Sequence, residues 1–306
     1  MASPDVTYAE LRGLAFAVAY RMVGSVSEAE DLVQEALLRL HRAHQEGGPA
    51  NPEAWITTVT TRLAIDHLKA ARTRRERYVG EWLPEPLLGE AAPGVEAVVE
   101  RDESLSLAFL VVLETLSPVE RAVFLLREVF DYSYEEIAPI VERTEANCRQ
   151  IALRARKHVE ARRPRFEPSP ELREELAGRF FAALSDGDVD GLVAVLADDV
   201  ALHGDGGGRV PALARSLHGA PRVARTLMAW VKAGRRADAR LEPALVNGQP
   251  GARIVDRAGR TVSVMEVEVA DGAVRAVHSV VNPDKLAHLG PLADYVEALR
   301  RRGPGR

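Results

Sequence analysis

Residues 133–159 read SYEEIAPIVERTEANCRQIALRARKHV, and this stretch decides the architecture of the middle of the chain. Ser133 followed by Glu136 is a capping box, which predicts the start of a short helix. The apolar spacing then breaks, and Thr144 caps a second helix that runs to Val159. A short helix, a tight turn and a basic second helix predict a helix-turn-helix, whose second helix enters the major groove of DNA.

The outward side of this second helix is polar and basic. Asn and Gln pair with adenine edges, and Arg reads guanine or holds phosphate. We therefore expect the following residues to contact DNA: Thr144, Asn147, Arg149, Gln150, Arg154 and Lys157. On the inner side, Cys148 is expected to be a small core residue rather than a reactive thiol. An ordinary helical hairpin stays open as an alternative, because the turn Glu142-Arg143 lacks a glycine.

The chain has 306 residues and a net charge of −5, which by itself argues against a nucleic-acid partner. Its basic residues are nevertheless clustered at 69–77 and 149–163, and DNA affinity depends on local phosphate neutralisation. No apolar run is long enough to span a bilayer, and the N-terminus lacks the order of a signal peptide. The single cysteine excludes an internal disulfide. We expect a cytoplasmic protein of two or three domains.

Helices are predicted on both sides of a proline-rich linker. Over residues 8–78, Ser27 with Glu30 is a capping box that opens a helix, and Asn51-Pro52 starts the next. Residues 104–163 are helical again, with a further capped start at Ser117. The linker over residues 79–103 contains Trp82-Leu-Pro-Glu-Pro86, whose prolines forbid a helix. Because exposing the large apolar ring of its tryptophan to water is unfavourable, we expect it to dock on a neighbouring domain.

Beyond a second linker at residues 164–170, the pattern changes. Helices are predicted over residues 171–184 and 189–196, and strands over 252–255, 261–269 and 273–281, separated by hairpin turns. The region 171–306 is therefore expected to be an α+β domain with helices packed on one curved sheet.

The helical part resembles the extracytoplasmic-function class of the sigma-seventy superfamily. The segment Ser27–Leu40, SEAEDLVQEALLRL, is similar to the helix that docks on the β′ coiled-coil of RNA polymerase core. The resemblance implies that Asp31, Leu32, Gln34 and Glu35 face the polymerase. An acidic and polar helix face can pair with a basic partner and fix its orientation.

Two further segments, Asn51–Ile56 and Ala64–Lys69, are similar to the helices that recognise and melt the promoter −10 element. The resemblance makes Trp55 a core residue and places these side chains on the DNA side: Arg62, Lys69, Arg72, Arg74 and Arg75. Many members of the class have asparagine in place of Arg62, so base readout is not carried over. The helix-turn-helix corresponds to the domain that reads the −35 element. The implied domains are 1–78, 104–163 and 171–306.

Three segments carry a second resemblance: Trp82–Pro86 of the linker, Asp205-Gly-Gly-Gly-Arg209 and Asn282-Pro-Asp-Lys-Leu286. Together they resemble the SigJ-type subgroup, which carries a SnoaL-like extension with a cone-shaped α+β fold of the NTF type. In that subgroup the extension regulates the attached sigma domains. Arg209 stands where a lysine is usual, which keeps the charge but changes the geometry. The glycines let the loop backbone approach a partner closely, such as the linker or a sigma domain. The implied regulatory residues are Trp82, Pro84, Pro86, Asp205, Gly206, Gly207, Gly208, Arg209, Asn282, Asp284 and Lys285.

SnoaL-like folds also carry isomerases, which need a general base in an apolar pocket. The available candidates are His203, Asp205, Glu266, Glu268 and His278. Glu266 and Glu268 share one strand face that we expect to be solvated, and His203 and Asp205 lie beside flexible glycines. We therefore expect no catalytic residue, cofactor or metal. A ligand-sensing helix-turn-helix regulator and an isomerase or cyclase in the tail remain the alternatives.

Overall fold

The computed structural model describes residues 7–75, 78–89, 105–161 and 168–294, the side chains of residues 72–75 excepted. The chain divides into two compact units. The helical unit comprises residues 1–77, 90–105 and 109–163, and the tail unit comprises residues 78–89, 106–108 and 164–306. Two segments from the predicted linker and helical region, Tyr78–Gly89 and Ser106–Ala108, thus belong with the tail by their contacts.

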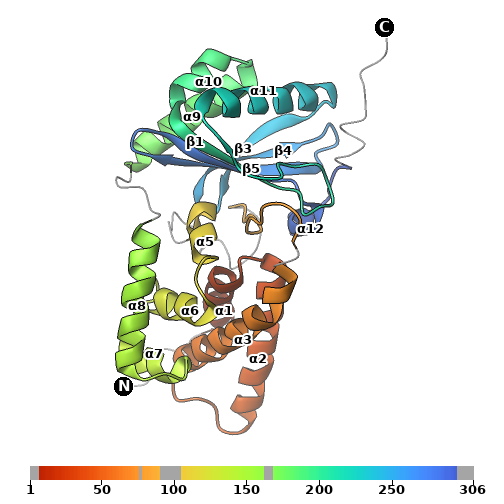
Figure 1. The fold of residues 1–306 in the computed structure, drawn as a ribbon. Coiled ribbons are helices and arrows are strands. Elements are labelled where there is room, and N and C mark those ends of the chain that lie inside the picture. The colour runs from red at the N-terminus through yellow and green to blue at the C-terminus, as the bar shows by residue number, and fades with distance from the viewer. Residues whose placement is uncertain (1–6, 76–77, 90–104, 162–167, 295–306) are drawn as a thin grey trace. The chain divides into compact units, whose positions relative to one another are not determined.

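Three helices form the first part of the helical unit: α1 (Tyr8–Val23), α2 (Val26–Gln45) and α3 (Pro52–Arg75), each packed on the other two (Figure 1). The apolar side predicted for α2 is buried, with Val33 and Ala36 fully enclosed. Asn51 caps α3 as predicted, because its Oδ1 accepts a hydrogen bond from the backbone N–H of Ala54 at 3.0 Å.

The predicted capping box of Ser27 and Glu30 is wrong. Helix α2 begins at Val26, and its N-cap is Ser25, whose hydroxyl accepts from the backbone N–H of Glu28 at 3.2 Å. Gly24 ends α1 in the left-handed conformation with φ of 67°, and α2 begins two residues earlier than the pattern suggested. Glu30 instead pairs with Arg12 at 2.7 Å.

The second part of the helical unit contains most of α5 (Leu107–Leu113), together with α6 (Pro118–Glu128), α7 (Tyr134–Ile140) and α8 (Glu145–Glu160). The capping boxes predicted at Ser117 and Ser133 are both formed, and Thr144 caps α8 by accepting from the backbone N–H of Asn147. Helix α8 packs on α6 and α7, while α3 contacts both α6 and α7. The predicted helix-turn-helix geometry of α7 and α8 is confirmed.

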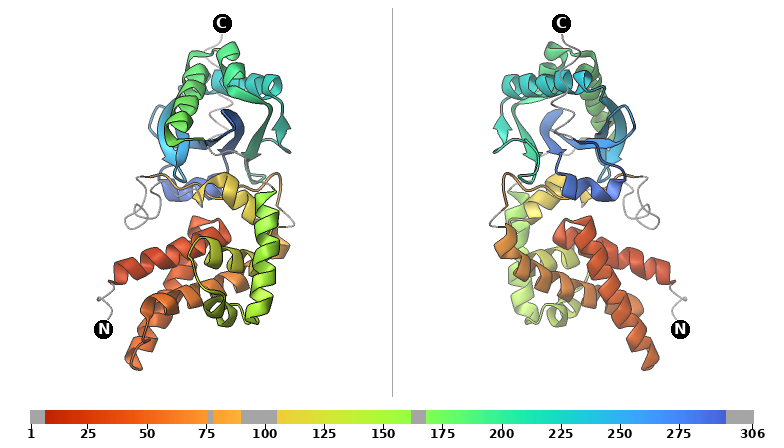
Figure 2. Two further views of the ribbon diagram at one scale, coloured as in Figure 1. Left: turned by 90° about the vertical axis from the view of Figure 1, so that its left-hand side faces the viewer. Right: turned by 90° about the vertical axis from the view of Figure 1, so that its right-hand side faces the viewer.

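The tail unit is a six-stranded sheet with helices on one face, as the views in Figures 1 and 2 agree. The elements are α9 (Pro170–Asp186), α10 (Val189–Val195), β1 (Leu196–Asp205), β2 (Leu217–His218), α11 (Ala220–Arg236), β3 (Arg240–Val246), β4 (Gln249–Val255), β5 (Thr261–Ala270), β6 (Ala273–Val280), α12 (Pro283–Leu286) and the 3-10 turn η2 (Ala287–Leu289). The strand order is β2-β1-β6-β5-β4-β3, in which β1 and β6 run parallel and the other neighbours antiparallel. The α+β prediction is confirmed, although the strands β1, β2 and β3 and the helix α11 were not predicted.

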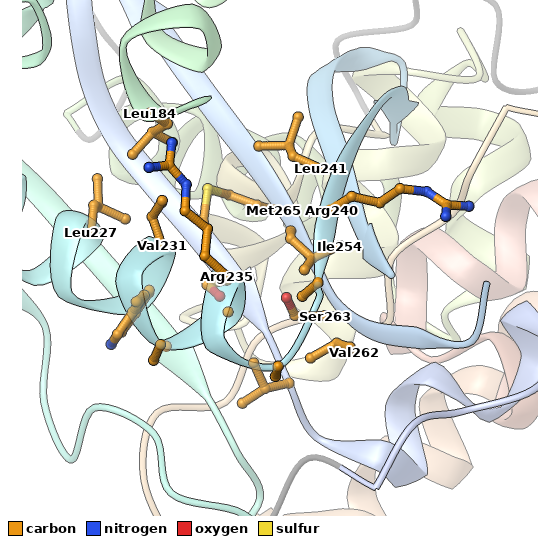
Figure 3. Close-up of a pocket in the computed structure, with 18 of the residues that line it drawn as sticks. Leu184, Leu227, Val231, Arg235, Arg240, Leu241, Ile254, Val262, Ser263 and Met265 are labelled. Atoms are coloured by element: carbon orange, nitrogen blue, oxygen red, sulfur yellow. The ribbon is translucent and has the colours of Figure 1, made fainter. Parts of the chain in front are cut away.

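The apolar core of the tail lies between its helices and the sheet, with Phe180, Leu192 and Val267 fully buried. At one end this layer opens into a cavity of about 640 Å³ (Figure 3). Its walls come from α11 on one side and from β3, β4 and β5 on the other. The opposite face of the sheet is covered by Tyr78–Gly89, so β5 and β6 are buried on both faces along most of their length.

Candidate functional site

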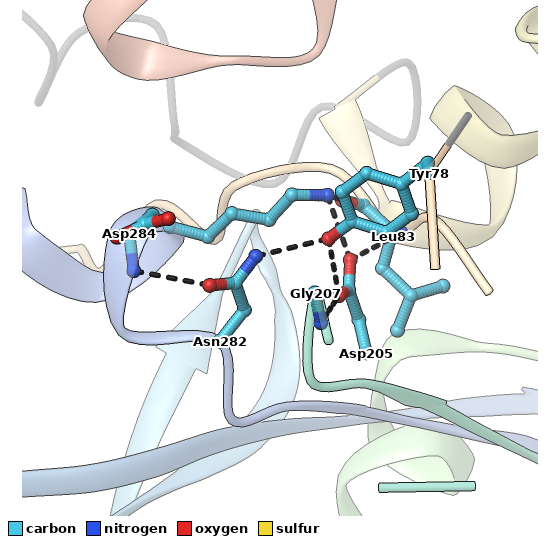
Figure 4. Close-up of polar contacts among 7 residues, drawn as sticks. Tyr78, Leu83, Asp205, Gly207, Asn282 and Asp284 are labelled. Carbon is cyan, nitrogen blue, oxygen red and sulfur yellow. Dashed lines mark hydrogen bonds and ion pairs between the residues drawn. The ribbon is translucent and has the colours of Figure 1, made fainter. Parts of the chain in front are cut away.

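Asp205, at the end of β1, is the centre of a polar network in the tail unit (Figure 4). Its side chain is fully buried. Oδ1 accepts hydrogen bonds from the Tyr78 hydroxyl at 2.5 Å and from the backbone N–H of Gly207 at 2.9 Å. Oδ2 accepts from the backbone N–H of Leu83 at 2.8 Å and from Nζ of Lys285 at 2.7 Å. The buried carboxylate is therefore fully satisfied, and two of its donors come from the segment Tyr78–Gly89.

Lys285 and Asn282 extend this network to the same segment. The Lys285 ammonium group also donates to the carbonyl oxygen of Leu83 and lies 4.1 Å from the centroid of the Trp82 ring. Asn282 donates from Nδ2 to the Tyr78 hydroxyl at 2.9 Å, and its Oδ1 caps α12. Burial, followed by the hydrogen bond to Asp205, raises the pKa of Tyr78, so its hydroxyl stays protonated and donates.

The glycines after Asp205 are required by close packing. A Cβ at Gly207, which has φ of 58°, would lie 2.2 Å from Nδ2 of Asn282. A Cβ at Gly208, with φ of 69°, would lie 3.0 Å from Val79 in the bound segment. This loop and Asp205 are thus fixed in place, and the expectation that flexible glycines leave Asp205 poorly organised is wrong.

Arg209 does not bond to the Tyr78–Gly89 segment. Its Nε lies 3.1 Å from Oδ2 of Asp284, and both side chains are mostly exposed. The expected charge-assisted contact with the linker is therefore made by Asp205, while Arg209 and Asp284 join two loops of the tail to each other. Gly206 packs against the backbone oxygen of Val210.

The rest of the bound segment is held by main-chain pairing and burial. Leu87 donates from its backbone N–H to Oδ1 of Asn247 at 2.9 Å and accepts from the Asn247 backbone N–H at 2.8 Å. Pro84 and Pro86 are buried, and the Pro86 carbonyl oxygen lies 2.8 Å from Nε2 of His288. The docking predicted for the Trp82–Pro86 stretch is confirmed as a contact with the tail.

The same face of the sheet carries a buried group of titratable side chains. Glu266 is fully buried and accepts a hydrogen bond from the backbone N–H of Leu107, at the start of α5, at 3.0 Å. Burial raises the pKa of Glu266 to about 8 and lowers that of its cross-strand neighbour His278 to about 3. The His278 ring stacks on His203, which pairs with Glu81 at 2.7 Å.

These positions overturn one expectation. Glu266 and Glu268 do share a face, but Glu266 is not solvated, because residues 78–89 and 106–108 cover it. Burial likewise raises the pKa of the half-buried Glu268. Among the described residues, no group of His, Cys, Asp and Glu is arranged to hold a metal ion.

Helix α2 presents most of the residues implied in polymerase binding. Asp31 and Gln34 are exposed, and Glu35 is half-buried and pairs with Arg39 at 2.7 Å. The expectation that Leu32 faces the polymerase is wrong, because this residue is 8% exposed and faces the core of the helical unit. The exposed apolar side chain on this helix is Leu38, at 53%, which the sequence analysis did not single out.

The basic residues of α3 lie in two environments. Arg62 donates from Nε to the carbonyl oxygen of Ile140 at 3.1 Å and from its terminal nitrogen to that of Pro139 at 2.7 Å. Lys69 is exposed and lies 3.2 Å from Asp66. The side chains of Arg72, Arg74 and Arg75 lie outside the described residues. In this conformation Arg62 therefore binds the carbonyl end of α7, where the helix dipole favours a cation.

The outward side of α8 has the predicted polar character. Of the six predicted contacts, Asn147 is half-buried and the other five are exposed: Thr144, Arg149, Gln150, Arg154 and Lys157. Cys148 is buried, and burial raises the pKa of its thiol, as expected for a core residue. The turn before α8 takes the left-handed conformation at Glu142, with φ of 55°, where a glycine is more common.

Several residues of the network escaped the sequence analysis, chiefly Tyr78, Leu83 and Asn247. Tyr78 lies at the end of a basic helical stretch and carries no signal of its own. Asn247-Gly248 does carry one, since an Asn-Gly pair between apolar runs indicates a hairpin turn, and it joins β3 to β4. Leu153, 55% exposed on α8, was also missed.

Comparisons with known proteins agree with this arrangement. A family model described as Sigma-70 region 2 matches residues 7–74, and one described as Sigma-70, region 4 matches residues 106–159. These matches define the helical unit as that of a sigma factor. The ECF RNA polymerase sigma factor SigJ of Mycobacterium tuberculosis is 38% identical over 284 residues, covering 90% of each chain. The probable ECF sigma factor SigI of the same species is 35% identical over 88% of this chain and 90% of its own.

The similarity extends through the tail. The crystal structure of M. tuberculosis SigJ superimposes with a TM-score of 0.76 at 36% identity, covering 94% of this chain and 99% of that one. The chain belongs to the ECF RNA polymerase sigma factors, with a SnoaL-like α+β domain fused after region 4. Within the described residues, no helix is long and apolar enough to cross a membrane.

Proposed function

We propose that this sigma factor recruits RNA polymerase core to promoter DNA in the cytoplasm and that its own tail restrains this activity. Helix α2 would meet the β′ coiled-coil through Asp31, Gln34 and Glu35, with Leu38 as an apolar contact. Helix α3 would engage the −10 element, and α8 the −35 element. An exposed row of polar and basic side chains on α8 supports the latter role.

The contacts between the first and second parts of the helical unit support a restrained state. Arg62 binds the end of α7, and Arg121, 3% exposed, donates to the Met22 carbonyl oxygen at 2.5 Å. By their names, the −10 and −35 elements lie roughly 25 base pairs apart, or ~85 Å along B-DNA. Helices that contact one another cannot reach both elements, so promoter binding requires α3 and α7 to separate.

The bound linker opposes that separation. Fully extended, residues 78–105 would reach about 95 Å. Because Tyr78–Gly89 and Ser106–Ala108 are both held on the tail, this length cannot be used to move the two parts of the helical unit apart. The observation that best supports this proposal is the position of the Asp205 carboxylate. It binds Tyr78 and Leu83 of this segment and Lys285 of the tail at once, and so holds the segment in place.

We further propose that the tail regulates without catalysing a reaction. The titratable candidates Asp205, Glu266 and His278 lie on the linker-covered face of the sheet, and the cavity lies on the other face. A general base must reach its substrate, and these groups do not line the cavity. An isomerase in the tail would therefore lack its base.

The test is run-off transcription with purified core polymerase on a cognate promoter. We expect promoter-specific transcripts from the full chain and several-fold more from Asp205→Asn, which weakens the hold on the linker. Asp284→Asn is the matched control, because it removes a carboxylate of the same tail that does not bond to the linker. Absence of any promoter-specific transcript would refute the sigma role, and equal output from wild type and Asp205→Asn would refute the restraint.

A further inference from the structure

The cavity of the tail unit has the composition of a binding site for a small apolar molecule. It measures about 640 Å³, within the range of pockets that hold small organic ligands. Figure 3 shows Leu227 and Val231 from α11 facing Leu241, Ile254 and Met265 from the sheet. A ligand in this space would gain its affinity mainly from apolar burial.

The charged groups on the cavity wall already have hydrogen-bond or ion-pair partners within the protein. Arg235 donates to the carbonyl oxygen of Ser185, and its side chain runs along the cavity toward Leu184 (Figure 3). Arg240, which points away from the cavity, binds Glu242. Asp256 binds Arg260 at 2.7 Å. A charged ligand would therefore have to break an existing pair or remain unpaired, which is costly in an apolar site.

Two hydroxyl groups on the wall are available instead. Ser263 and Ser279 are 8% and 3% exposed, and in the part of the chain that the structure describes neither side chain makes a hydrogen bond. Ser279 stands opposite Met265 in the β5–β6 register, so strand alternation places it on the cavity face beside Ser263. Both hydroxyls can donate to a ligand oxygen.

We propose that this cavity binds a neutral apolar molecule carrying one hydrogen-bond acceptor, such as a ketone or an ether, which Ser263 and Ser279 recognise. Among the described residues that line the cavity there is no His, Glu or Lys, and the one carboxylate among them, Asp256, is held by Arg260. The molecule is therefore bound and released unchanged. The site is independent of the linker contact, although Gly204 and Val281 of its wall adjoin Asp205 and Asn282 in sequence.

The test is a fluorescence titration of the full chain with prodan, a neutral naphthalene ketone whose emission shifts to the blue in apolar surroundings. We expect saturable binding of one probe per chain. Val231→Trp and Leu241→Trp fill the cavity from opposite walls and should each weaken binding at least ~10-fold. Val189→Trp, at an exposed position of α10, is the matched control and should bind like the wild type.

The role of the hydroxyls is tested separately. Ser263→Ala and Ser279→Ala should each weaken prodan binding ~2- to 10-fold, the effect of one lost hydrogen bond, and leave binding of dimethylaminonaphthalene, which lacks the ketone, unchanged. Anionic anilinonaphthalene sulfonate should bind at least ~10-fold more weakly than prodan. Non-saturable prodan binding, wild-type affinity in both folded tryptophan variants, or equally tight binding of the anion would overturn the proposal. Binding is measured without polymerase, so its outcome does not depend on the transcriptional role.

Discussion

The ammonium nitrogen of Lys285 lies 2.7 Å from Oδ2 of Asp205, and the two side chains are 8% and 0% exposed. Both groups also bind the main chain of Leu83, at its carbonyl oxygen and its N–H respectively. The ion pair thus binds both main-chain polar groups of one linker residue. Linker binding and charge neutralisation in the tail are therefore a single structural event.

Removing the cation alone should be costly. Lys285→Met leaves the Asp205 carboxylate buried without its ion partner, and we expect a loss of about 3–5 kcal/mol in the free energy of unfolding of the tail. Adding Asp205→Asn should recover part of this loss, because no unpaired charge then remains. Urea unfolding of the full chain followed by circular dichroism measures both variants. Arg209→Ala, which removes an exposed pair, should change stability by less than ~0.5 kcal/mol, and additivity of the first two changes would contradict the coupling.

The tyrosine of the network offers a milder change. Tyr78→Phe removes the donor to Asp205 and the acceptor for Asn282 while keeping the ring. We expect the linker to become several-fold more sensitive to limited proteolysis, with the helical and tail units still folded. Tyr8→Phe, an exposed change outside the network, serves as the control. Equal cleavage rates in the two variants would argue against a role for this hydroxyl in holding the linker.

The loop glycine should not tolerate a side chain. Gly207→Ala combines a left-handed backbone with a Cβ 2.2 Å from Asn282, so we expect destabilisation of roughly 2 kcal/mol or more. Gly272→Ala is the matched comparison, because this glycine has φ of 77° but nothing within 4 Å of the added Cβ. Thermal unfolding of both variants separates the backbone effect from the packing effect. If the two variants lose equal stability, the close packing of Gly207 is not important.

Glu266 should make stability depend on pH. Its pKa is about 8 when folded and 4.5 ordinarily, so its contribution to stability is complete below pH 4.5 and is lost as pH rises toward 8. His278, with a pKa lowered from 6.5 to about 3, contributes stability that is complete above pH 6.5 and is lost as pH falls toward 3. The two pH dependences cancel between pH 4.5 and 6.5. The free energy of unfolding therefore declines by ~2 kcal/mol from pH 6.5 to 8.

Glu266→Gln should abolish that alkaline decline, because an amide keeps the acceptor for the Leu107 N–H without ionising. Urea unfolding at pH 6.5 and pH 8 measures the effect. Glu242→Gln, on the edge strand β3, should retain the wild-type decline. A wild-type decline in Glu266→Gln would assign the pH dependence to another group.

Two substitutions on α8 should distinguish a contact with phosphate from a contact with a base. Lys157→Ala should weaken holoenzyme binding to all promoters alike and reduce the salt slope by about 1. Gln150→Ala should relax the preference at one −35 position by ~1–3 kcal/mol. Fluorescence anisotropy on labelled promoter DNA, at several salt concentrations and with single-base variants, distinguishes the two. A sequence-dependent effect of Lys157→Ala would contradict its assignment to phosphate.

Local signals predicted the helix starts well. Ser117, Ser133 and Thr144 cap helices as expected, because a cap depends only on the next three residues. Ser25 was missed in favour of Ser27, since both are followed by glutamate three residues on and only the turn at Gly24 decides between them.

Long-range burial was beyond a sequence pattern. Alternation correctly placed Glu266 and Glu268 on one face, but the residue that covers Glu266, Leu107, lies 159 positions away in the chain. The edge strand β3 was missed because Arg240, Glu242 and Pro243 break the apolar alternation, as is common at sheet edges. The linker's docking was predicted from one tryptophan, yet Tyr78, which contributes its hydroxyl, gave no such signal.

The tail and the segment it holds are parts of one polypeptide, and this has a kinetic consequence. Their association is a first-order process. The fraction of molecules in which the tail holds the segment therefore does not change with the amount of sigma factor in the cell. A separate inhibitor would be titrated as expression rises, whereas this one always matches its target one to one. Only an agent that favours one form, such as polymerase, pH or a ligand in the tail, can shift the balance.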